Sequence, residues 1–124
     1  MHNNKKTVII GATNNPSRYA YLAAERLAAH DHSFIPVSIK KGEVLGEPIL
    51  NLKNHPEIPE VHTITLYINP SHQKQWEDYI LSLSPDRIIF NPGTENPDLV
   101  EKAKNAGIET VYGCTLVMLS AGTY

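Results

Sequence analysis

The chain has 124 residues, of which 41% are hydrophobic and 19% are charged, and this length predicts one domain spanning residues 1–124. Its formal net charge of −2 argues against a general binder of nucleic acid or of anionic membranes. No apolar run is long enough to cross a membrane, and the polar start, residues 1–6, lacks the apolar stretch of a secretory signal. A single cysteine, Cys114, cannot form an internal disulfide, which fits a reducing cytoplasm.

The first half of the chain predicts a strand, a helix and a second strand. Residues 7–10 form a short β-branched run, which is typical of a buried strand. Small and apolar residues then recur at helical spacing over residues 20–28 and make one face that is nearly all alanine. Residues 34–37 predict the second strand. The glycines and prolines of residues 38–60 predict a loop with one helical turn.

The second half continues the same alternation of strands and helices. Third, fourth and fifth strands are predicted at residues 61–68, 87–90 and 108–112. After the third strand, Ser71 is expected to cap a helix, and its apolar face carries Trp76, Tyr79, Ile80 and Leu83. After the fourth, Asn96-Pro97 predicts a helix start.

Gly107 is expected to end that helix. Residues 114–119 are apolar and fit either a last helical turn or an edge strand.

Short apolar strands that alternate with helices are typical of parallel β-α-β units. The sequence therefore predicts an α/β, Rossmann-like, three-layer αβα fold with a five-stranded, mostly parallel sheet. In such folds ligands bind at the carboxyl ends of the strands, near the point where the strand order reverses.

The end of the first strand has the composition of an anion site. Gly11, which precedes Ala12, allows close approach of the backbone, Thr13 and Asn15 can donate hydrogen bonds, and Arg18 can bind a phosphate with two N–H groups. The helix that follows adds unpaired N–H groups. The second and third glycines of the dinucleotide fingerprint are missing, so an ordinary strand–loop–helix turn remains an alternative.

The end of the second strand reads Val37-Ser38-Ile39-Lys40-Lys41. A site for NAD typically has an acidic residue at this position, which binds the ribose diol. A hydroxyl and two lysines instead favour a ribose that bears a phosphate, either the 2′-phosphate of NADP or the 3′-phosphate of coenzyme A. A solvated lysine pair is the alternative.

The third and fourth strand ends are expected on the same edge of the sheet. Leu66, Tyr67 and Ile68 can form an apolar wall beside a base or a pantetheine arm, and Pro92-Gly93 lies in a polar turn. Each feature alone is typical of a turn, but four such strand ends on one edge indicate a ligand site.

Together these motifs resemble the small CoA-binding-domain family, whose members are stand-alone relatives of the nucleotide domain in the alpha subunit of succinyl-CoA synthetase. The resemblance covers residues 7–119. It rests on Gly11-Ala12-Thr13, Asn15-Pro16, Arg18-Tyr19, Pro36-Val37, Lys40, Val44-Leu45-Gly46, Pro92 to Asn96, Ala106 to Ile108 and Cys114. Ser38 and Ile39 stand where Asn and Pro are usual, and Asn91 stands where Gln is usual.

The resemblance implies that the first loop and helix start hold a pyrophosphate and that Lys40 lies near a phosphorylated ribose. It also implies that residues 66–68 lie along the ligand. The residues expected to bind the cofactor are Gly11, Ala12, Thr13, Asn15, Pro16, Arg18, Tyr19, Val37, Ser38, Lys40, Leu66, Tyr67, Ile68, Pro92 and Gly93.

The sequence carries no metal-site or hydrolase signature, and Cys114 alone has latent covalent chemistry. We therefore expect a cytoplasmic, non-catalytic protein that binds coenzyme A or an acyl-CoA. A small NADP-binding oxidoreductase, or a component of one, is the alternative, and an interaction subunit with a vestigial pocket is a third. Neither nucleic acid nor membrane is expected as a partner. The helix around Trp76 is a candidate surface for a homodimer.

Overall fold

The fold is built on one sheet of six parallel strands, in the order β5-β2-β1-β6-β7-β8. The structure is a computed structural model and describes residues 4–124. In sequence order the strands of this sheet are β1 (Thr7–Ile10), β2 (Phe34–Ser38), β5 (Leu50–Asn51), β6 (Thr63–Leu66), β7 (Arg87–Phe90) and β8 (Glu109–Tyr112). Ile10 is paired with Val37 and with Leu66, so these strands end at the same level.

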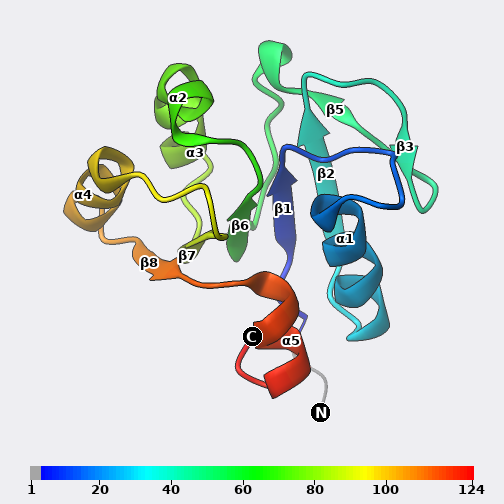
Figure 1. Cartoon of the computed structure of the whole chain (residues 1–124). Helices are drawn as coiled ribbons and strands as arrows, with labels where there is room; N and C mark the ends of the chain where they lie inside the picture. The colour runs from blue at the N-terminus through cyan, green and yellow to red at the C-terminus, as the bar shows by residue number, and fades with distance from the viewer. Residues whose placement is uncertain (1–3) are drawn as a thin grey trace.

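Helices cover both faces of the sheet (Figure 1). On one face, α1 (Tyr19–Ala29) and α5 (Thr115–Ala121) pack over a core that contains Ile9, Ile89 and Leu27. The other face carries α2 (Pro70–Gln73), the 3₁₀ turn η2 (Lys74–Trp76), α3 (Glu77–Ser82) and α4 (Pro97–Asn105). The predicted Rossmann-like α/β class is confirmed.

The main sheet has six strands, one more than the five that the sequence predicts. Residues 38–60 contain the edge strand β5 and a hairpin of β3 (Glu43–Val44) and β4 (Glu47–Pro48) as well as the predicted helical turn, η1 (Leu52–Asn54). Strands of two residues are too short to show an alternating pattern, and this is why the sequence predicts only a loop. The parallel pairing of β5 makes the sheet fully parallel.

The predicted cap at Ser71 is wrong. The Asn69 side chain accepts the capping hydrogen bond from the His72 N–H at 3.1 Å, and the Ser71 hydroxyl donates to the same Asn69 oxygen. Asn96 caps α4 as predicted, because its Oδ1 accepts from the Leu99 N–H at 3.2 Å. Residues 115–121 form a helix, which resolves the two alternatives for the last segment.

The apolar face around Trp76 belongs to the core. Trp76 is 9% exposed and Tyr79 is 7% exposed, and both pack with Ile80 against the sheet. These side chains therefore do not form an open dimer surface, and a homodimer stays a prediction.

The expectation about the polar start at residues 1–6 falls partly on residues 1–3, which lie outside the described residues. Within residues 4–124, each helix is too short or too polar to cross a membrane.

Candidate functional site

A cavity of about 540 Å³ lies at the carboxyl ends of four neighbouring strands, β2, β1, β6 and β7. This is the edge of the sheet that parallel α/β folds use for ligands. It is lined by Gly11, Thr13, Arg18, Tyr19, Ala20, Ser38, Ile39, Lys40, Tyr67, Ile68, Asn69, His72, Pro92, Gly93 and Thr94.

The first loop is held against its neighbouring strands by its own backbone. The amides of Gly11 and Ala12 both donate to the Val37 carbonyl oxygen, at 2.9 and 3.2 Å. Gly11 has a φ of +97°, and a Cβ there would lie 2.8 Å from Ile68 Cγ2 and 2.9 Å from the Tyr67 carbonyl carbon. Gly11 therefore serves the packing of β1 against the end of β6, and its amide is not free for a ligand.

Other donors lie at the start of α1. No side chain of the described residues caps this helix at Arg18, and the first N–H groups of a helix have no partner within it. Tyr19 and Ala20, the first two helical residues, line the cavity together with the exposed Arg18 side chain. The helix start and the guanidinium together offer an anion both N–H donors and positive charge.

A tight turn after β2 presents Lys40 to the cavity. The buried Ser38 hydroxyl accepts a hydrogen bond from the Lys40 N–H at 3.1 Å. The Lys40 side chain is exposed and lines the cavity, whereas the adjacent Lys41 does not. The structure thus distinguishes the positions of two neighbouring lysines that the sequence alone cannot distinguish.

Tyr67 forms part of the inner wall. Its hydroxyl is buried and has no hydrogen-bond partner among the described residues, and burial raises its pKa to about 12. The neighbouring hydroxyls of Thr65 and Thr115 are bonded to each other at 2.8 Å. Tyr67 is therefore uncharged at neutral pH and adds an aromatic surface to the lining.

Asn91 organises the far side of the cavity. Its side-chain amide donates to Thr65 Oγ1 at 2.7 Å and to the Leu66 carbonyl oxygen at 2.9 Å, and its Oδ1 accepts from the Thr115 N–H at 2.9 Å. Its own carbonyl oxygen accepts from the Thr94 N–H and hydroxyl. Asn91 thus joins β6, β7 and α5 and shapes the turn that carries Pro92 and Gly93.

The permanent charges in the lining of the cavity are both positive. Its lining includes Arg18, Lys40 and the imidazole of His72, and it includes no aspartate or glutamate. With the uncapped helix start and the aromatic and aliphatic surfaces of Tyr67 and Ile68, this donor set fits a ligand that combines phosphate groups with an apolar part.

The sequence matches the family model of the CoA binding domain over residues 5–120. The chain belongs to the CoA-binding domain family. A crystal structure of an uncharacterized protein is similar at 61% identity, with a TM-score of 0.95, and the match covers 98% of this chain and 99% of that one. Comparison with curated proteins gives no match.

Two more distant structures share the fold. A hypothetical protein from Pyrococcus horikoshii OT3 has 23% identity and a TM-score of 0.82, with 95% of this chain and 83% of that chain covered. The cell-free ID.343 protein from Thermus thermophilus has 23% identity and a TM-score of 0.81, with 98% and 91% covered.

Most of the residues that the sequence predicts for a CoA site meet at the cavity. Ten of the fifteen line it: Gly11, Thr13, Arg18, Tyr19, Ser38, Lys40, Tyr67, Ile68, Pro92 and Gly93. The other five do not. Ala12, Val37 and Leu66 are buried in the sheet and its first turn, whereas Asn15 and Pro16 are exposed on the loop.

Asn15 has a local structural role. Its Oδ1 accepts hydrogen bonds from the N–H and the hydroxyl of Ser17, at 3.0 and 2.8 Å. It therefore shapes the loop that leads into Arg18 and α1.

Five lining residues were not predicted, namely Ala20, Ile39, Asn69, His72 and Thr94. Ile39, Asn69 and Thr94 directly follow the predicted residues Ser38, Ile68 and Gly93, so extending each predicted segment by one position finds them. His72 follows its strand end by six residues and enters the lining only because α2 begins immediately at Pro70.

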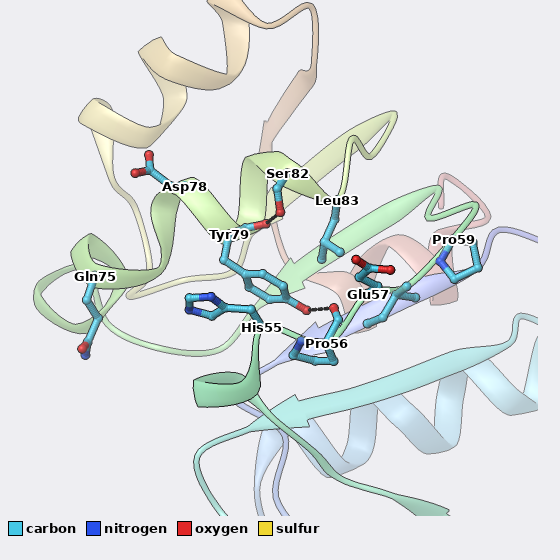
Figure 2. A pocket seen from close by; sticks show the side chains of 10 residues that line it. His55, Pro56, Glu57, Pro59, Gln75, Asp78, Tyr79, Ser82 and Leu83 are labelled. Atoms are coloured by element: carbon cyan, nitrogen blue, oxygen red, sulfur yellow. Dashed lines mark hydrogen bonds between the residues drawn. The ribbon is translucent and has the colours of Figure 1, made fainter.

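A larger cavity of about 860 Å³ lies between α3 and the segment 55–59 (Figure 2). Tyr79 forms one wall, where its ring stacks on His55 and its hydroxyl donates to the Pro56 carbonyl oxygen at 2.6 Å. The lining includes the carboxylates Glu57 and Asp78 and neither lysine nor arginine. Negative charge disfavours a phosphate ligand. Although this cavity is the larger of the two, the cavity at the strand ends is therefore the better candidate for a phosphate-bearing ligand.

No group of three metal-ligating side chains comes together within the described part of the chain. Cys114 is a half-buried free cysteine that precedes α5, and it does not line the cavity at the strand ends.

Proposed function

We propose that this protein binds coenzyme A or an acyl-CoA in the cavity at the strand ends and has no catalytic activity of its own. Family membership supports a CoA-type ligand. The observation that carries the proposal is the lining itself, because residues from four strand ends form one cavity with two permanent cations and no carboxylate.

In this proposal the pyrophosphate binds at the start of α1. The Tyr19 and Ala20 amides and the Arg18 guanidinium supply donors and positive charge on the same side of the cavity. The amides of Gly11 and Ala12 take no part, since the Val37 carbonyl oxygen already accepts from both.

Lys40 is assigned to the 3′-phosphate of the ribose. It stands at the end of β2, next to β1, where Rossmann-like folds recognise the ribose of a nucleotide. Tyr67 and Ile68, further along the same edge, are assigned to the pantetheine arm.

Replacing Lys40 tests the assignment, with the neighbouring Lys41 as the matched control. We expect Lys40→Ala to weaken CoA binding about tenfold to a hundredfold, because a charge-assisted contact worth about 1.5–3 kcal/mol is lost. Lys41→Ala removes the same charge one residue away and is expected to leave the affinity nearly unchanged. Isothermal titration with CoA measures both variants.

Dephospho-CoA and NADP complete that experiment. The unmodified protein is expected to bind dephospho-CoA more weakly than CoA, and Lys40→Ala is expected to bind the two equally. Equal binding of both ligands by the unmodified protein would refute the role of Lys40. Tighter binding of NADP than of CoA would refute the proposed ligand.

A further inference from the structure

We infer that the site discriminates against acyl groups that end in a carboxylate, and that Glu95 is the residue responsible. This inference rests on the proposed function, since it concerns the acyl part of an acyl-CoA bound in the same cavity. Glu95 is exposed and directly follows the lining residue Thr94, in the turn between β7 and α4.

The cavity is electrostatically asymmetric along the edge of the sheet. The strand order places the end of β2, with Lys40, and the end of β7, with Pro92 to Thr94, at opposite ends of the lining. Three strand spacings separate them, or about 14 Å. The helix α1, which begins directly after Arg18, packs against β2, and His72 follows β6.

The β7 end is the anionic end. Glu95 folds back so that its Oε1 accepts a hydrogen bond from the Gly93 N–H at 2.9 Å. This holds a carboxylate against the lining residue Gly93 and engages its amide, while the Thr94 amide donates to the Asn91 carbonyl oxygen. No lysine or arginine comes from the β7 strand end to offset the charge.

This asymmetry matches the charge of an acyl-CoA. The phosphates of the ligand carry its negative charge and belong at the end with Lys40 and Arg18, so the uncharged pantetheine arm extends towards β7. An acyl group at the end of this arm then approaches Glu95. A neutral acyl group meets no penalty there, whereas a terminal carboxylate is repelled by the like charge.

The test compares two acyl-CoA probes with acyl chains of four carbons. Butyryl-CoA is uncharged at the end of its chain, and succinyl-CoA ends in a carboxylate. We expect the unmodified protein to bind succinyl-CoA about three- to tenfold more weakly than butyryl-CoA, as expected for like charges in a partly solvated site. Titration calorimetry on the whole chain gives both dissociation constants.

Glu95→Gln removes the charge and keeps an oxygen that can accept from the Gly93 N–H. We expect this variant to bind the two probes with nearly equal affinity, while its affinity for butyryl-CoA stays close to that of the unmodified protein. Glu101→Gln makes the same charge change on an exposed residue of α4 that is not part of the lining, and it is expected to retain the discrimination.

The outcomes separate this inference from the proposed function. If neither probe nor CoA binds, the proposed function is wrong. If CoA binds but both probes bind equally to the unmodified protein, only the acyl selectivity is wrong. If the discrimination exists but persists in Glu95→Gln, the selectivity does not come from Glu95.

Discussion

At the scale of single residues, Gly11 is constrained by two independent features of the site. Its φ of +97° is costly for any residue with a Cβ, and a Cβ would also collide with the Tyr67 backbone and the Ile68 side chain. We expect Gly11→Ala to lower the free energy of unfolding by about 2–4 kcal/mol, as the sum of backbone strain and overpacking. Urea denaturation measures the change.

Gly93 provides the control for that substitution. It has a similar φ of +92°, but nothing lies within 4 Å of the position of its Cβ. Gly93→Ala is therefore expected to show only the strain, about 1–2 kcal/mol. Equal losses of unfolding free energy in the two variants would mean that the close approach of Gly11 to residues 67–68 does not add to the cost of the substitution.

The sequence predicts which residues meet at the cavity better than it predicts the contacts that each of them makes. Gly, Pro, Asn and Ser mark the strand ends locally, and parallel pairing brings these ends together. The use of the Gly11 and Ala12 amides depends on the Val37 carbonyl oxygen, 25 or more positions further along the chain. Such a contact follows from strand register, which the local pattern does not specify.

At the scale of elements, a buried polar network fixes α2, α3 and α4 to the far wall of the cavity. The Gln73 side-chain amide donates to the carbonyl oxygens of Ile68 and Thr94, at 2.9 and 2.7 Å. The Asn96 amide donates to Gln73 Oε1 and to Glu77 Oε2, both at 3.0 Å. Because Ile68 and Thr94 line the cavity, this network sets the position of that wall.

Glu77 is the charged member of the network and is 4% exposed. Burial alone would raise the pKa of its carboxyl, but hydrogen bonds from Lys102 and Asn96 outweigh burial and hold the pKa below its usual value. A carboxyl group whose pKa is lower in the folded state than in the unfolded state stabilises the fold at pH values above its unfolded-state pKa. This stabilisation is lost as the pH falls through the folded-state pKa.

Glu77→Gln tests this contribution. At pH 7 the variant is expected to be less stable by about 1–3 kcal/mol, because the buried Asn96 amide loses its charged acceptor. As the pH falls through the folded-state pKa of Glu77, the difference from the unmodified protein should shrink, since the carboxylate of the unmodified protein is then being protonated. Urea denaturation at pH 7 and at a series of lower pH values measures both, and a difference that grows in acid would contradict the lowered pKa.

The elements that sequence patterns miss are the shortest ones. β5 pairs through only two residues, Leu50 and Asn51, with Val37 and Ser38. The helix expected after Ser71 is divided into α2, η2 and α3, although its apolar spacing holds throughout. Periodicity reports which side of a segment is buried, and it is less sensitive to a local change between α and 3₁₀ geometry.

At the scale of the whole molecule, the two ends of the sheet differ. The carboxyl end is open at the cavity, whereas at the amino end Tyr124 is 7% exposed and closes the core. Its hydroxyl lies 2.5 Å from Thr7 Oγ1, its ring lies 4.2 Å from the Arg87 Cζ, and its main-chain oxygen accepts from Arg87 at 3.0 Å. Tyr124 thus joins β1 to β7 and covers a buried guanidinium.

This arrangement predicts that Tyr124 governs stability and not ligand binding. We expect Tyr124→Ala to lower the free energy of unfolding by about 3–5 kcal/mol, through loss of a buried aromatic side chain. The exposed Tyr112 is the control, and its replacement by Ala should change stability by less than about 1 kcal/mol. CoA affinity, measured by calorimetry well below the melting temperature, should be the same in both variants. A large loss of affinity in Tyr124→Ala would show instead that the two ends of the sheet are coupled.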